Sequence, residues 1–149
     1  MSEMSDYMEG QLIAHLFRTS TFTKPTTIAI ALLTTNAVDS DTGVFTGGTG
    51  VEVTNAGAYA RLSGATLTNP LDANWTAPSA GDGQTDNAKT LTFTQATGNW
   101  GTVAAMALVD NATYNTGNMW FYTAVDTPKA ISTGDTAEFA IGAITVTLA

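Results

Sequence analysis

Few residues of this 149-residue sequence could support catalysis. There is no cysteine, which excludes thiolate nucleophiles, thiolate metal sites and disulfides. His15 is the only histidine, and no acidic residue lies three or four positions before it. Because a general base or a catalytic metal ligand works beside such partners, we interpret His15 as a helix-surface or interface residue. A hydrolase that uses two carboxylates is the alternative, but no pair is fixed by spacing, and we expect no catalytic residue.

Two acidic, glycine-containing stretches could bind a cation. Asp39-Ser-Asp-Thr-Gly43 begins like a calcium loop, in which alternate oxygens converge on a hard cation. The pattern then fails, since Val44 replaces the invariant glycine and Gly50 replaces the bidentate glutamate. Asp82-Gly-Gln-Thr-Asp86 is similar. We expect solvated turns at both places, and neither a metal ion nor a cofactor.

The charge balance excludes two classes of partner. The 13 acidic residues outnumber the 5 basic ones, which gives a net charge of −8. Little positive charge is available to neutralise phosphates, so we expect no binding to nucleic acid or to anionic membranes. Apolar runs such as Ile28–Leu33 are far shorter than the roughly 20 residues of a membrane-spanning helix. The acidic N-terminus also lacks the pattern of a signal peptide.

One helix is expected, at the N-terminus. Ser5 or Asp6 can act as its N-cap, and Met8, Leu12 and Leu16 recur at the spacing of one helical face. We expect this apolar face to pack on the chain's own β-domain, with a partner subunit as the alternative.

The rest of the sequence predicts strands. With 28 Thr, 23 Ala and 14 Gly, the composition favours a β-protein with many turns. Both faces of Thr26–Thr35 are apolar, which predicts a central strand covered on both sides. Val103–Val109 and Met119–Val125 flank a turn-rich segment and predict a hairpin. Shorter strands are expected at Tyr59–Leu67, Thr90–Thr97, Ala130–Ser132, Ala137–Ile141 and Ile144–Leu148. We predict an all-β fold, a single β-sandwich or jelly-roll-like domain at 25–149, preceded by an amphipathic helix and arm at 1–24.

The tryptophans differ in their surroundings. Trp120 is followed by Phe121 and Tyr122 and is expected in the core, and Trp100 is expected to close one end of the domain. Trp75 lies in a polar stretch and is the aromatic most expected to be exposed, where it could anchor a protein or carbohydrate contact. Packing of Trp75 on its own domain is the alternative.

Five segments carry a resemblance to known proteins. They are Ser5-Asp-Tyr-Met-Glu-Gly-Gln-Leu-Ile-Ala-His-Leu-Phe-Arg18, Pro25 with Ile30-Ala-Leu-Leu-Thr34, Gly57-Ala-Tyr-Ala-Arg61, Asn99-Trp-Gly-Thr-Val103 and Gly134-Asp-Thr136. Together they resemble a group of small tailed-bacteriophage virion proteins that are labelled tail-fibre or capsid decoration (cement) proteins. The resemblance implies a structural, non-enzymatic role on the outside of a phage particle.

Between the two labels, we favour capsid decoration. A tail fibre normally needs stalk repeats or a long coiled coil, and neither is present. We therefore expect a protein that stabilises the outer capsid surface, with the major capsid protein and further copies of itself, in a homo-oligomer, as partners. The alternative is a tail-associated fibre or adaptor protein involved in host recognition. The residues predicted to contact a partner are Leu16, Phe17, Arg18 and Trp75.

Overall fold

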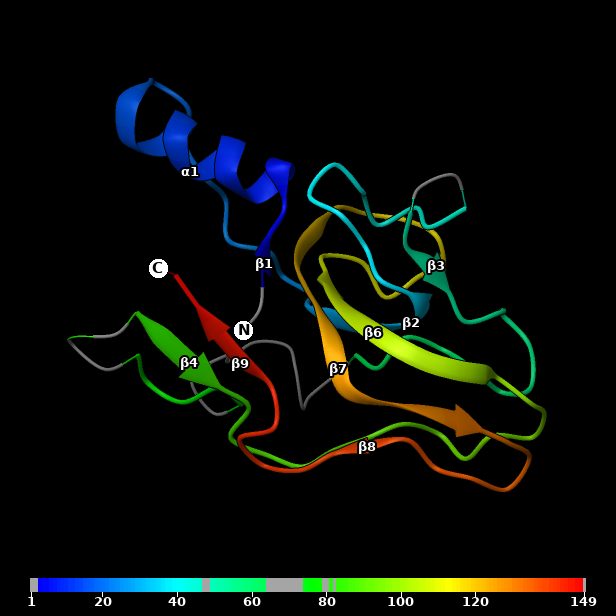
Figure 1. Ribbon diagram of the computed structural model, residues 1–149. Helices are drawn as coiled ribbons and strands as arrows, with labels where there is room; N and C mark the ends of the chain where they lie inside the picture. The colour runs from blue at the N-terminus through cyan, green and yellow to red at the C-terminus, as the bar shows by residue number, and fades with distance from the viewer. Residues whose placement is uncertain (1–2, 47–48, 64–73, 79–80, 82, 149) are drawn as a thin grey trace.

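The computed structural model describes residues 3–46, 49–63, 74–78, 81 and 83–148. Its elements are β1 (Glu3–Met4), α1 (Asp6–Phe17), β2 (Ala29–Thr35), β3 (Val51–Glu52), β4 (Gln84–Asp86), β5 (Leu91–Thr92), β6 (Gly101–Val109), β7 (Met119–Ile131), β8 (Glu138–Phe139) and β9 (Thr145–Thr147). An open antiparallel sheet has the strand order β1-β7-β6-β2-β3, and two small sheets pair β4 with β9 and β5 with β8 (Figure 1). The prediction of a mostly β fold with one N-terminal helix is confirmed.

β2 is buried on both faces, as its apolar pattern predicts. Ile30 and Leu32 belong to the larger core cluster, whereas Ala29, Ala31 and Leu33 belong to a second cluster on the opposite face of the sheet. None of these five side chains is more than 1% exposed. The strand begins at Ala29 rather than at Thr26 and pairs with β6 from Ala29 to Leu33.

The predicted hairpin is formed by β6 and β7, and β7 is longer than expected. Of the segment Ala130–Ser132, predicted as a separate strand, Ala130 and Ile131 form the end of β7. The register shifts between the pairs Val103↔Lys129 and Ala105↔Ala124, so β7 has extra residues there, including Pro128. A proline lacks the N–H that a ladder needs and is tolerated in such a bulge, which explains why a turn-like sequence lies inside a strand.

The remaining predicted strands are shorter than expected. Of Thr90–Thr97, only the first part forms β5, although Phe93 N–H and Ala96 N–H still donate to Ala137 O and Asp135 O, both at 2.9 Å. The strands predicted at Ala137–Ile141 and Ile144–Leu148 are present as the shorter strands β8 and β9. In the stretch predicted from residue 59 to 67, Leu62 forms an isolated bridge to Ile30, and residues 64–67 lie outside the described residues.

Trp100 and Trp120 occupy different environments. Trp100 is 4% exposed in the larger core cluster, and its indole N–H donates to Gly57 O at 2.8 Å. Trp120, expected in the core, is only half-buried. It is the extra residue between the pairs Val109↔Met119 and Leu108↔Phe121, and a bulge of this kind turns a side chain out of the regular alternation.

A buried ion pair joins β3 to the surrounding loops. Arg61 donates from Nε and Nη2 to the two carboxylate oxygens of Glu52, both at 2.8 Å, and the two side chains are 0% and 1% exposed. Its remaining N–H groups donate to three loop carbonyls, those of Gly43, Asn111 and Thr116, at 2.7 to 2.9 Å. One guanidinium therefore fixes three chain segments that are distant in sequence.

Tyr59 completes this network. Its hydroxyl donates to Glu52 at 2.9 Å and accepts from the backbone N–H of Leu32 at 3.0 Å. Burial raises the pKa of Tyr59, and the negative charge of Glu52 raises it further. The phenol is therefore held in its neutral form.

Candidate functional site

The first turn of α1 is anchored on the large sheet. Ser5 is the N-cap: its hydroxyl accepts from Met8 N–H at 3.3 Å and donates to the carbonyl of Met119 in β7. The backbone N–H of Asp6 donates to Asp39 O at 2.9 Å, and the side chain of Met8 is 6% exposed. The choice between Ser5 and Asp6 as the cap is thus settled in favour of Ser5.

A tyrosine between two carboxylates holds the segment before the helix. The hydroxyl of Tyr122 in β7 bonds to Glu3 at 2.7 Å and also to Asp39. Burial raises the pKa of Tyr122, as do these two hydrogen bonds. Strand pairing of β1 with β7 adds the pairs Glu3↔Tyr122 and Met4↔Phe121. The beginning of α1 therefore has a fixed direction relative to the sheet.

The second half of α1 has an apolar surface that nothing in the described chain covers. Ile13, Leu16 and Phe17 are 58%, 70% and 80% exposed, and Arg18 is exposed beside them. Figure 1 shows the helix extending away from the sheet beyond its first turns. The expectation that the apolar face packs on the chain's own domain is therefore correct for Met8 and wrong for the end of the helix. We call Ile13, Leu16, Phe17 and Arg18 the helix end.

The chain after α1 returns along the helix towards the sheet. The backbone N–H of Phe22 donates to His15 Nδ1 at 3.3 Å. The ring of Phe22 then lies 5.4 Å from that of Trp120, centroid to centroid. His15 is exposed on the helix surface, as predicted, and here it ties the helix to the returning segment.

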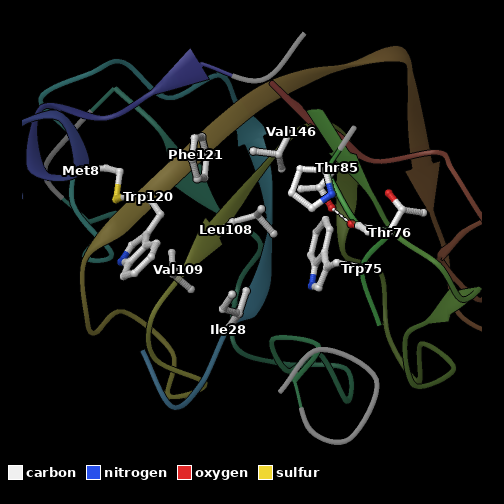
Figure 2. A pocket seen from close by; sticks show the side chains of 12 residues that line it. Met8, Ile28, Trp75, Thr76, Thr85, Leu108, Val109, Trp120, Phe121 and Val146 are labelled. Atoms are coloured by element: carbon white, nitrogen blue, oxygen red, sulfur yellow. Dashed lines mark hydrogen bonds between the residues drawn. The ribbon is translucent and has the colours of Figure 1, made fainter. Parts of the chain in front are cut away.

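An apolar pocket of about 390 Å³ opens beside the anchored turn of α1. Figure 2 shows Leu108, Val109 and Phe121 on the large sheet between Trp120 on one side and Trp75 on the other. The lining residues come from α1, the large sheet, the segment before β2, the segment before β4, and β4 and β9: Met8, Ile28, Trp75, Thr76, Ala77, Pro78, Thr85, Leu108, Val109, Trp120, Phe121 and Val146. Polar side chains are limited to threonines and the two indoles, so the pocket suits an apolar group.

Trp75 is part of this pocket and does not stand alone on the surface. It is half-buried, packs against the larger core cluster and forms a bridge to Asn87 through its backbone. Its indole N–H and that of Trp120 are both buried, and neither has an acceptor among the described residues. The alternative considered above, packing on its own domain, describes Trp75 best.

The four residues predicted as partner contacts do not form one surface. Leu16, Phe17 and Arg18 lie together at the end of α1, whereas Trp75 lines the pocket, to which α1 contributes only Met8. That these four residues contact a partner remains a prediction. The pocket itself was missed, because its walls come from segments that no sequence motif connects.

The acidic stretch around Asp41 has a structural role. Its carboxylate accepts three backbone N–H groups, from Val38, Thr49 and Gly50, at 2.8 to 3.1 Å. Asp82 lies outside the described residues. Within the described part of the chain, no three His, Cys, Asp or Glu side chains gather as a metal site would require, and no helix has the length and apolarity to span a membrane.

Comparison with known proteins identifies the family. The family model described as "Podophage GP4 fiber I protein gp80" matches residues 3–147, almost the entire chain. No curated protein matches. The description agrees with the tail-fibre alternative of the sequence analysis and gives no support to capsid decoration. The chain therefore belongs to the Podophage GP4 fiber I protein gp80 family and is a phage fibre protein, a structural component of the virion.

Proposed function

We propose that this protein is a non-enzymatic, tail-associated fibre subunit that attaches to the rest of the virion through the helix end. Family membership supports the fibre role. The observation that carries the attachment is the exposure of Leu16 and Phe17, 70% and 80%, at the tip of a helix whose start is fixed to the sheet.

Exposed apolar side chains in this arrangement are typical of a docking surface. Single exposed apolar residues are common on any protein, but three that adjoin on one helix form a contiguous patch. An amphipathic helix that lays such a face into a groove is a recurrent mode of recognition. Arg18 adds a charged group at the border of the patch, where interfaces carry polar residues.

An adaptor role is favoured over direct host recognition. Direct host recognition was expected to use Trp75 as an exposed anchor. Trp75 is instead half-buried and packs against the core of its own domain. A contact with the major capsid protein, which the capsid-decoration hypothesis requires, is the alternative that the copy number in the virion would reveal.

The test is to count the protein in purified virions against the major capsid protein by quantitative mass spectrometry. A fibre subunit should be present in far fewer copies than the capsid subunit. A copy number close to that of the capsid protein would instead support capsid decoration.

A second arm of the same experiment tests the attachment surface. Virions made with Phe17→Glu should lack the protein, because the charge would be buried on docking. Ile141→Glu is the matched control, since Ile141 is 67% exposed and lies far from α1 in sequence. Normal incorporation of Phe17→Glu would refute attachment through the helix end.

A further inference from the structure

We propose that the apolar pocket between Trp75 and Trp120 receives the helix end of a second copy of this chain. This inference rests on the proposed function, in which the helix end is an assembly surface, and it names the partner of that surface. The same sequence would then supply both the projecting apolar group and its receptor.

The helix end cannot fill the pocket of its own chain. Met8 already lines the pocket wall, and Ser5, three residues earlier, is fixed to β7. Leu16 and Phe17 follow Met8 by eight and nine residues, which places them about 12–14 Å farther along the helix axis. To bring them back, α1 would have to leave both its cap and its strand pairing. An occupant from another copy needs no such rearrangement.

The pocket and the helix end match in chemistry. A volume of about 390 Å³ lies within the range of binding pockets, roughly 300–1,000 Å³. Its walls present aromatic and aliphatic groups with few polar partners, which disfavours a carbohydrate with its many hydroxyls. The side chains of Leu16 and Phe17 are apolar and exposed, so their burial in this pocket would lower the free energy of the assembly.

The charge distribution favours contact between copies. No acidic residue lies between Glu9 and Asp39, and this segment contains Arg18 and Lys24, so residues 10–38 carry a formal charge of +2. The net charge of −8 leaves −10 for the rest of the chain, because −8 − (+2) = −10. Asp86 directly follows the pocket residue Thr85. Arg18 and Lys24, at and after the helix end of one copy, would therefore approach the acidic remainder of another copy, which offsets part of the repulsion between two acidic proteins.

The experiment measures the mass of the purified full-length chain in solution, by light scattering and sedimentation, up to millimolar concentration. The helix variant is Leu16→Glu with Phe17→Glu, and the pocket variant is Ala77→Trp, which adds a ring at an exposed position of the lining. Ile141→Glu is the control. Thermal unfolding verifies that each variant is folded, and all four substituted positions are exposed, so folding should be preserved.

The expected result is that the wild-type chain and the control self-associate, whereas each variant alone is a monomer. An equimolar mixture of the two variants should form heterodimers, since the helix variant retains an intact pocket and the pocket variant retains an intact helix. A monomeric wild-type chain, association that either variant leaves unchanged, or a mixture without heterodimers would overturn the inference.

Failure of this inference can be distinguished from failure of the proposed function. If the wild-type chain is monomeric but Phe17→Glu still abolishes incorporation into virions, the helix end binds a different virion protein, and only the pocket assignment falls. If incorporation is unchanged while self-association is lost, attachment to the virion does not use the helix end, and the contact between copies stands.

Discussion

The buried pair of Glu52 and Arg61 gives the sharpest prediction for stability. Glu52→Gln preserves the shape of the side chain but removes its charge, which leaves a guanidinium that is 0% exposed without its counter-ion. Removal of one partner from a buried pair costs about 3–5 kcal/mol. For a chain of this length, each kcal/mol lowers Tm by about 2–4 °C, so we expect Tm to fall by about 6–20 °C.

The assay is thermal and urea unfolding at neutral pH. The control is Glu138→Gln, since Glu138 accepts one hydrogen bond, from Thr92 at 2.9 Å, on the exposed surface, and its loss should cost less than about 1 kcal/mol. A loss below about 1 kcal/mol for Glu52→Gln as well would refute the view that this pair holds the loops together.

Three further predictions concern the fold and its anchors. Gly10→Ala should raise stability by about 1 kcal/mol in unfolding assays, because a Cβ there meets nothing within 4 Å in the helix, whereas Gly43→Ala should lower it, because the Cβ would lie 2.5 Å from Thr116 O. Ser5→Ala should lower the free energy of unfolding by about 1–2 kcal/mol and speed amide hydrogen exchange in α1, because both the N-cap and a buried hydrogen bond are lost. Unchanged exchange rates would contradict the anchoring of α1 by Ser5. Burial raises the pKa of Tyr59, so this phenol keeps its proton in the folded state, whereas in the unfolded chain it ionises near pH 10. The free energy of unfolding should therefore keep its full value below pH 10 and decrease above it, and Tyr59→Phe should reduce this decrease.

Patterns confined to one segment predicted the fold well. The doubly apolar run of β2 and the hairpin of β6 and β7 need only local periodicity and turn residues, and both are confirmed. The same kind of local signal limits the N-cap to Ser5 or Asp6, and the structure shows that it is Ser5. By contrast, the local pattern predicts Ala130–Ser132 as a separate strand, because it does not reveal that a bulge can accommodate Pro128 within β7.

Features that depend on tertiary partners could not be predicted. Glu52 lies between Val51 and Val53, and a charged residue at such a position is normally expected to face solvent. Val51 is 44% exposed and Glu52 is 4% exposed instead, because Arg61 provides a counter-charge within the interior. Arg61 belongs to a segment that carried the family resemblance, which was the one available signal of its importance. The pocket had no comparable signal.

The pairing of β1 with β7 has a consequence for the order of folding during synthesis. Glu3 and Tyr122 are separated by 119 residues, so at about 5–20 residues per second a ribosome releases the partner strand roughly 6–24 s after β1. A helix of 12 residues with a central glycine is marginal by itself, so α1 gains stability only when Ser5 reaches β7. The nascent chain therefore presents an ordered helix end only after most of its body has been made.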